Sequence, residues 1–314
     1  MSWRRSGDRR LPTHDPAVAV GGRAGGAAPS AAGHPRNRAW LGLVPLLAFL
    51  SLFLVVPAIV VFQRSLTDND GNVGFTALRN AFTGQNFDAF VFSVRLSGQA
   101  ALVGVVIGAL LAYAATMITR PRWLRSLITS FSGVAANLGG IPLAFAFIAL
   151  IGRQGLLTKI LDGAFGYKLY GGSFTLDSTW GLTTVYSYFN IPLMVLVTLP
   201  AVDGLKASWR EACANLGGTS LTYWRRIGLP VLFPSLLGGF LLLFANSFSA
   251  YATAAAISRK SLIVPLRIGF YLRGDVSANE DQLGFALAAW MILIMTVSMG
   301  LYWFLRKRAE RWQQ

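Results

Sequence analysis

The sequence has almost no thiol or imidazole groups. Its 314 residues include one cysteine, Cys213, and two histidines, His14 and His34, which both lie near the N-terminus. A single cysteine cannot form an intrachain disulfide or supply the several thiolates of a structural metal site. Because both histidines lie near the N-terminus, the rest of the chain cannot contain a histidine metal cluster or a histidine proton relay. We therefore expect no metal site.

Charged residues are also scarce, at 13% of the chain, and acidic ones are the rarer kind, with 13 Asp and Glu against 28 Lys and Arg. Hydrophobic residues make up 54% of the chain, and the mean hydropathy is +0.51. This composition indicates a membrane protein. A helix that crosses a bilayer needs about 20 apolar residues. The charge-free runs of that length are 39–63, 96–119, 126–152, 178–202, 227–258 and 282–305.

The runs lack the strict two-residue alternation of barrel strands, and most are too long for them, so each backbone must satisfy its own hydrogen bonds as a helix. We predict an all-α membrane protein with six transmembrane helices in residues 39–305. Of the 28 basic residues, 18 lie in the two tails and in the second-to-third and fourth-to-fifth connections. Basic residues stay preferentially on the cytoplasmic side, so both termini are predicted to be cytoplasmic.

Topology also explains the net charge of +15, which does not need a nucleic-acid partner. Residues 1–38 are rich in Gly, Ala, Pro and Arg and have no apolar periodicity, so we expect a disordered basic tail. Residues 306–314 form the C-terminal cytoplasmic tail. The location that follows is the cell membrane, inner or plasma, with several crossings and with lipid as a partner.

Two kinds of energy coupling are missing from the chain. The six runs contain no ionisable side chain, which disfavours a carrier driven by a proton or sodium gradient. None of the five lysines follows a glycine, so the chain lacks the Gly-Lys-Ser/Thr phosphate loop of an ATPase. We expect no enzyme activity, no catalytic residue and no cofactor on this chain.

The polar stretch 203–230 between the fourth and fifth runs contains the most specific pattern in the sequence. It has the form E-A-small-x3-G-x9-I-x-L-P. The fixed positions are Glu211, Ala212, Cys213, Gly217, Ile227, Leu229 and Pro230.

The same stretch predicts two short helices. Ser208 and Glu211 have the spacing of a capping box, so the first helix is expected to start there. Left-handed terminators and a cap for the second helix follow in the order Gly217, Gly218, Thr219 and Ser220. Apolar residues at helical spacing predict one face, made of Trp209, Cys213, Leu216, Leu221, Trp224 and Ile227.

Arg210 and Asn215 are predicted to face elsewhere, and Leu229 with Pro230 to end the second helix. A short amphipathic helix of this kind can be offered to a groove in a partner. An ordinary cytoplasmic loop, in which Glu211 only caps a helix, is the alternative.

The spacing resembles the EAA motif, the cytoplasmic loop of permease subunits of ATP-binding-cassette (ABC) importers, at every fixed position except Cys213, where the family has alanine. The neighbouring phrases around this loop, and the phrase from Gly139 to Gly152, resemble the spermidine/putrescine, iron(III), phosphonate and thiamine branch. The resemblance covers roughly residues 40 to 310 and implies a type I importer permease. It also implies separate ATPase subunits that bind ATP, a second permease that is either another copy or a paralogue, and an extracytoplasmic solute-binding protein.

The residues that the resemblance assigns to ATPase coupling are Arg210, Glu211, Ala212, Cys213, Gly217, Arg225, Ile227, Leu229 and Pro230. Arg225 either strengthens the contact electrostatically or anchors the loop at the membrane. The implied solute is a polyamine. Iron(III), phosphonate, thiamine or another small solute are alternatives, as is a membrane scaffold with no transport role.

Polar residues inside the apolar runs are candidates for the solute pathway, or alternatively for hydrogen bonds between helices. They are Asn137, Asn190, Asn246, Ser247, Ser249 and Tyr251.

Overall fold

The computed structural model describes residues 43–67, 73–118, 120–172, 174–258, 263–273 and 281–310. The tail predicted for residues 1–38 and residues 311–314 lie outside them. The described residues are almost entirely helical, with one isolated β-bridge between Thr67 and Val73 and no strand. The helices long and apolar enough to cross a membrane are Val44–Leu66, Gly84–Met117, Gly140–Phe165, Thr179–Asp203, Ser220–Ser249 and Asp281–Leu305. The prediction of an all-α protein with six spans is confirmed.

The chain divides into two units. The first, Met1–Leu50, contains α1 (Val44–Leu50). The second, Ser51–Gln314, contains η2 (Ser51–Val55), α2 (Val56–Leu66), α3 (Thr76–Asn80), α4 (Gly84–Met117), α5 (Arg122–Asn137), α6 (Gly140–Ile151), α7 (Leu156–Phe165), α8 (Thr179–Asp203), α9 (Ala207–Asn215), α10 (Ser220–Tyr223), η3 (Trp224–Gly228), α11 (Leu229–Ser249), α12 (Ala252–Ile257), α13 (Val264–Leu272) and α14 (Asp281–Glu310).

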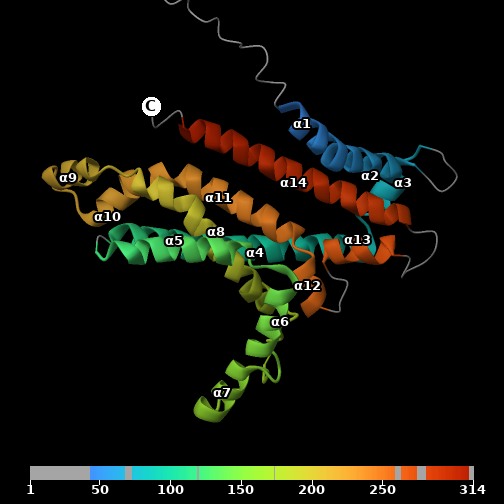
Figure 1. Cartoon of the computed structure of the whole chain (residues 1–314), viewed down its shortest axis with the longest axis horizontal. Helices are drawn as coiled ribbons and strands as arrows, with labels where there is room; N and C mark the ends of the chain where they lie inside the picture. The colour runs from blue at the N-terminus through green and yellow to red at the C-terminus, as the bar shows by residue number, and fades with distance from the viewer. Residues whose placement is uncertain are drawn as a thin grey trace, which may run out of the picture. The chain divides into compact units, whose positions relative to one another are not determined.

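The second unit is a bundle built around α4, α8 and α11, with α5 against α8 and α14 against α11 and α2 (Figure 1). Glycines let these helices approach closely, as is common between helices in membranes. A Cβ added at Gly108 of α4 would lie 2.6 Å from the Cβ of Met194 and 2.8 Å from the carbonyl oxygen of Ile191, both on α8. The close contact between α4 and α8 therefore depends on the absence of a side chain at Gly108.

Gly108→Leu is expected to lower the free energy of unfolding by about 1–3 kcal/mol, because the added side chain must force α4 and α8 apart. Gly98 offers a matched control on the same helix, since a Cβ there meets nothing within 4 Å. Thermal unfolding of both variants in detergent checks the prediction. Equal midpoints for Gly108→Leu and Gly98→Leu would contradict it.

Two predicted spans are wrong in detail, because each is broken by a turn. The run 126–152 forms α5 and α6, which are separated at Leu138 and Gly139, and α6 leaves the bundle at an angle (Figure 1). Gly140 has a φ of +74°, a left-handed conformation that favours glycine, and this turns the chain out of the line of α5. The spanning helix counted by length and composition is instead Gly140–Phe165.

The run 227–258 is broken in the same way, because α11 ends at Ser249 and α12 begins at Ala252. The two breaks contact each other. The amide of Gly140 donates to Oγ1 of Thr253 at 2.9 Å, and this hydroxyl donates to the carbonyl of Gly140 at 3.2 Å. One threonine thus satisfies both backbone groups of Gly140 where α6 begins.

Candidate functional site

The predicted capping box at the start of α9 is wrong. The helix begins at Ala207, its N-cap is Lys206, and no side chain caps it. Ser208 is therefore the second residue of the helix rather than its cap. Because Glu211 has no capping role here, its exposed side chain is free for another contact.

The C-terminus of α9 is a Schellman motif. The amide of Gly217 donates to the carbonyl of Ala214 at 2.9 Å, and the amide of Gly218 donates to the carbonyl of Cys213 at 2.8 Å. Gly217 has a φ of +74°, which confirms the predicted left-handed terminator at this position. Gly218 does not have a positive φ, so a left-handed conformation there is wrong. Space restricts it instead, because a Cβ would lie 2.6 Å from Sγ of Cys213.

The second helix of the polar stretch begins with α10. It is capped as predicted but does not end as predicted. Oγ1 of Thr219 accepts from the amide of Thr222 at 3.3 Å. From there the chain stays helical through α10, η3 and α11 as far as Ser249. Pro230 therefore does not end this helix. It lies in the first turn of α11, where its missing amide is tolerated.

A wide turn precedes the proline. In η3 the amide of Leu229 donates to the carbonyl of Trp224, five residues earlier, which is a π-helical bond. Within this turn Gly228 leaves room for the Trp224 ring, because a Cβ there would lie 2.6 Å from Cε3. The π-turn thus places the Trp224 side chain along the helix at the junction between the polar stretch and the fifth span.

Aromatic contacts hold this junction against α4. The ring of Trp224 meets the ring of Tyr113 edge to face, with centroids 4.9 Å apart at 86°. Tyr223 is 3% exposed. The guanidinium of Arg210 lies 5.5 Å from the centre of the Tyr223 ring, with Nη2 3.5 Å from the Tyr113 hydroxyl. Arg210, predicted to contact an ATPase, is thus directed toward α4.

A second contact lies at the end of α8. Arg125 of α5 and Asp203, the last residue of α8, form an ion pair and a hydrogen bond. The pair connects the helix that precedes α9 to a neighbouring helix of the bundle. Sequence reasoning missed Tyr113, Tyr223 and this ion pair. The only available signal concerned Tyr223, which is adjacent to Trp224 and forms with it an unusual pair of large aromatic residues in a polar stretch.

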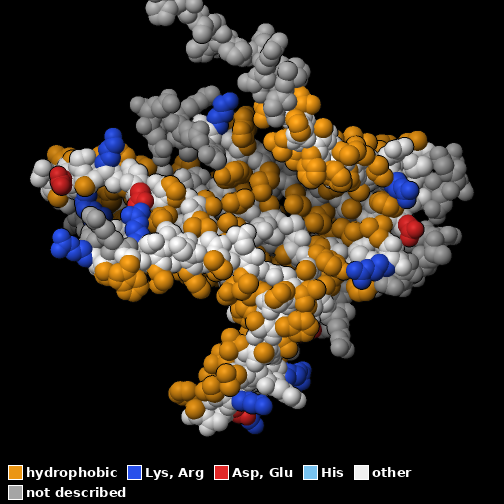
Figure 2. Space-filling model, viewed as in Figure 1, with side chains coloured by type: hydrophobic (Ala, Val, Ile, Leu, Met, Phe, Trp, Pro, Cys, Tyr) orange, Lys and Arg blue, Asp and Glu red, His pale blue; other side chains and the backbone are white. Residues whose placement is uncertain are grey.

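The side of this polar stretch that faces away from α4 is exposed. We call α9, the Schellman turn and α10 with η3 the coupling element, residues 207–228. The coupling element exposes two leucines, Leu216 at 89% and Leu221 at 76%. The space-filling view shows charged side chains of both signs at the end of the molecule where Figure 1 labels α9 and α10 (Figure 2). Large apolar side chains exposed among charges are typical of a surface that contacts another protein.

A pocket of about 500 Å³ opens between α9 and the start of α11. Trp209, Cys213, Leu216 and Ile227, predicted to share an apolar face, line it together. Leu221 and Trp224, predicted on the same face, do not. Its other lining residues are Ala212, Gly218, Thr222, Arg226 and Val231. The motif residues Ala212, Cys213 and Ile227 therefore meet in space, whereas Glu211, Arg225, Leu229 and Pro230 are exposed around them.

No protein-family model matches the chain. A probable permease protein for starch degradation products, AmyD of Thermoanaerobacterium thermosulfurigenes, is 25% identical over 284 residues, 86% of this chain and 94% of the relative. The molybdenum transport system permease ModB of Mycobacterium tuberculosis is 29% identical over 196 residues, 62% of this chain and 68% of the relative. The ferric transport permease FbpB of Actinobacillus pleuropneumoniae is 22% identical over 257 residues, and the match spans only 37% of it.

A solved structure has the same fold. A chain of a bacterial ABC transporter that imports alginate superposes with a TM-score of 0.61 at 18% identity, over 87% of this chain and 94% of that one. The chain is thus similar in sequence and in fold to permease subunits of ABC importers. The permease is a multi-pass membrane protein. The relatives named above transport starch products, molybdenum and iron, and none is described as a polyamine permease.

The polar residues in the spans of the permease fall into two groups. Asn190 is fully buried, and its Nδ2 donates to Oγ of Ser247 at 2.8 Å, which joins α8 to α11. Asn137 and Asn246 are exposed on the surface of the bundle. Asn190 and Ser247 thus act between helices, and the two exposed asparagines are the better placed to meet a solute.

The remaining two candidates also form hydrogen bonds. The Ser249 hydroxyl donates to the carbonyl of Asn246 at 3.1 Å, in the last turn of α11. The Tyr251 hydroxyl accepts from Nη2 of Arg273 at 3.1 Å, at the break between α11 and α12. Both lie near the broken end of α11, beside the exposed Asn246.

Proposed function

We propose that this permease forms part of the solute pathway of an ABC importer and receives force from a separate ATPase subunit through the coupling element. One observation carries the proposal. On one side the element is fixed to the bundle, because Trp224 and Arg210 both contact Tyr113 of α4. On the other side it exposes Leu216 and Leu221. A segment held on one side and apolar on the other is suited to transmit a partner's movement.

Rigidity matters because of the energy involved. Moving a two-state equilibrium from 1:99 to 99:1 takes about 5.5 kcal/mol. An ATPase subunit that closes on ATP can deliver this work only if the contact between the subunits does not bend. The Schellman turn at Gly217 restricts bending in the middle of the coupling element, and the ring contact at Trp224 restricts it near the C-terminal end.

The fold comparison supports further partners. The alginate importer has been solved in complex with a periplasmic protein that carries an alginate pentasaccharide. By analogy, this permease docks an external solute-binding protein, and it pairs with a second permease, either another copy or a paralogue. The ATP is bound and hydrolysed on the ATPase subunits.

Reconstitution tests the function. The permease, the ATPase, the second permease and the binding protein are assembled in liposomes, and ATP hydrolysis is measured with and without loaded binding protein. We expect loaded binding protein to raise hydrolysis several-fold. A purified complex without a nucleotide-binding subunit would favour a scaffold, and uptake that survives ATP depletion but needs an ion gradient would favour a secondary carrier.

The acidic residues of the spans distinguish two candidate solutes, a polyamine and a saccharide. A polyamine follows from the resemblance, and a saccharide from AmyD, which aligns along 94% of its length. Recognition of a polycation inside the membrane would use acidic side chains. The six candidate spans carry acids only near their ends, at Asp88, Asp162, Asp203 and Asp281. We therefore favour the saccharide, with a polyamine only if the external protein alone recognises it.

A direct binding measurement distinguishes them. The purified binding protein of the system is titrated with spermidine and with maltooligosaccharides, and the saturating ligand is then used to stimulate hydrolysis in liposomes. Saccharide binding with stimulation supports our choice. Spermidine binding with stimulation would reject it without affecting the proposed permease function.

A further inference from the structure

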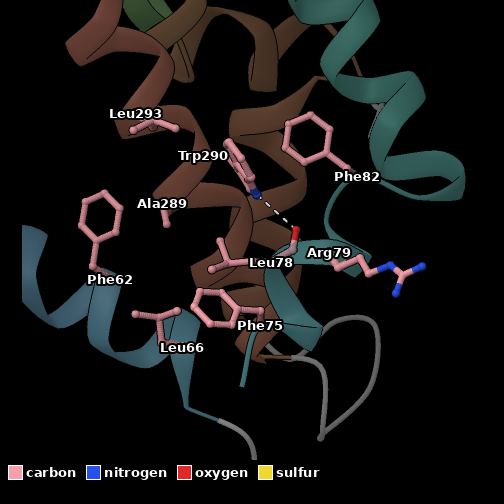
Figure 3. A pocket seen from close by; sticks show the side chains of 9 residues that line it. All are labelled: Phe62, Leu66, Phe75, Leu78, Arg79, Phe82, Ala289, Trp290 and Leu293. Carbon is pink, nitrogen blue, oxygen red and sulfur yellow. Dashed lines mark hydrogen bonds between the residues drawn. The ribbon is translucent and has the colours of Figure 1, made fainter. Parts of the chain in front are cut away.

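A groove of about 720 Å³ lies between α2, α3 and α14, far along the chain from the coupling element (Figure 3). Its volume is within the range of about 300–1,000 Å³ that small-molecule sites occupy. The residues that line it are Phe62, Leu66, Phe75, Leu78, Arg79, Phe82, Ala289, Trp290 and Leu293. Neither the coupling element nor the candidate pathway residues contribute to it.

The lining of the groove favours an apolar ligand. Eight of its nine lining residues are apolar or aromatic. The indole of Trp290 brings one polar atom, and its Nε1 already donates to the carbonyl of Leu78 at 3.1 Å (Figure 3). A ligand in the groove therefore needs no hydrogen-bonding group of its own.

Aromatic contacts keep the wall of the groove in place. The ring of Phe82 meets Trp290 edge to face, with centroids 4.5 Å apart at 86°. On its other side Phe82 stacks on Phe90 of α4, at 4.9 Å and 6°. A wall fixed by two ring contacts is formed before a ligand binds, which lowers the entropy lost on binding.

Measured along α2 and α14 from their nearer ends, the groove falls within half the thickness of a hydrocarbon core. Phe62 is four residues from the end of α2 and Trp290 nine residues from the start of α14, which correspond to about 6 and 14 Å along these helices. Half of a bilayer's hydrocarbon core is about 15 Å thick. Phe75 is 72% exposed at the rim, and hydrophobic side chains cover the surface over α2 and α14 (Figure 2). The groove thus opens toward lipid.

One arginine lines the groove, Arg79 of α3, and a second, Arg64, lies on α2, which forms one of its walls. Figure 3 shows the guanidinium of Arg79 directed away from the apolar lining. Arg64, two residues after Phe62, holds its guanidinium 5.3 Å from the centre of the Phe285 ring. Neither arginine has an ion-pair partner among the residues that the structure describes. The predicted topology places this end outside, so retention of basic residues in the cytoplasm does not explain these two charges.

We propose that this groove binds an anionic phospholipid, with one acyl chain in the groove and the phosphate at Arg79 and Arg64. A lipid supplies both chemistries that the site presents, an apolar chain and a negative group at the membrane surface. Basic residues beside apolar pockets between transmembrane helices recognise anionic headgroups in this way. The surrounding bilayer provides the ligand at high local concentration, so no protein partner is needed to cover the groove.

Native mass spectrometry tests the site on the full chain or its complex, after delipidation in detergent. Dioleoyl-phosphatidylglycerol is titrated, with phosphatidylcholine and inorganic phosphate as competitors. We expect one tightly bound phosphatidylglycerol that inorganic phosphate does not displace. Arg79→Gln should weaken it about five-fold, the effect of about 1 kcal/mol for one basic residue near the membrane surface. Arg153→Gln, the same change at an exposed arginine outside the groove, should leave it unchanged.

A second variant tests the chain site. Leu293→Trp should fill the groove and remove the tight lipid, whereas Leu110→Trp, on the exposed face of α4, should not. Equal lipid retention in these two variants would overturn the proposal. So would displacement by inorganic phosphate, or loss of a bound protein subunit rather than lipid in Leu293→Trp.

Discussion

Gly217→Val is expected to reduce the stimulation of ATP hydrolysis by loaded binding protein at least ten-fold. The permease should still insert in the membrane. Gly217 has a φ of +74°, and a Cβ there would meet nothing within 4 Å. The restriction is therefore one of backbone conformation and not of space. A left-handed conformation costs an ordinary residue about 1–2 kcal/mol, and a β-branched residue tolerates it least.

The strain is relieved most easily if the Schellman turn opens, because this turn is held by two backbone hydrogen bonds. An open turn releases α9 from α10, so a movement of the ATPase bends the coupling element and does not move the bundle. The measurement is hydrolysis in liposomes with and without loaded binding protein, beside the amount of permease and ATPase that purify together.

Two controls make the result specific. Gly217→Asn introduces a side chain that tolerates the left-handed region and should keep most of the stimulation. Gly166 ends α7 with a φ of +65° and also has open space around its Cβ position, so Gly166→Val places the same strain outside the coupling element. Normal stimulation in Gly217→Val, or an equal loss in Gly166→Val, would reject the role of this turn.

The sequence predicted the number and type of the spans because bilayer thickness leaves a strong signal, about 20 apolar residues without charge. It did not predict where two of the runs break. The break at Gly139 and Gly140 combines the left-handed Gly140, which belongs to the run, with a hydrogen bond to Thr253, which lies 113 residues further along the chain. Composition within a single run contains no trace of such a contact.

The local structure of the coupling element was predictable where one residue determines the geometry. The positive φ of Gly217 and the cap at Thr219 follow from the side chains alone. The capping box failed because Ser208 and Glu211 lie inside a helix that starts earlier. Pro230 failed as a terminator because the π-turn at 224–228 leads into the first turn of α11, where a proline is tolerated.

The direction of Arg210 could not be predicted, because it depends on two rings from different parts of the chain. Tyr113 belongs to α4 and Tyr223 to α10. Periodicity indicates which residues share a face of a helix but not which neighbour that face meets. The same limit applies to Asn190, whose hydrogen bond to Ser247 crosses between two spans.

The contact between Trp224 and Tyr113 is expected to carry force between the coupling element and the bundle. Trp224→Ala should reduce the stimulation of hydrolysis by loaded binding protein about ten-fold and leave the ATPase bound, because Leu216 and Leu221 still face the partner. An edge-to-face pair contributes about 0.5–1.5 kcal/mol beyond the apolar area it buries, enough to allow the element to loosen without unfolding. The measurements are stimulated hydrolysis and co-purification of the ATPase.

A double-mutant cycle separates this role from a general loss of packing. If the two rings act through each other, Tyr113→Ala should cause a similar loss, and the double variant should be no worse than either single one. Trp224→Phe keeps a ring at the contact and should retain part of the stimulation. Trp303→Ala removes an exposed ring from α14 and should have no effect. Additive losses at Trp224 and Tyr113 would instead mean that each ring acts separately, and the link between α4 and the coupling element would then have to lie in Arg210 or in the ion pair of Arg125 with Asp203.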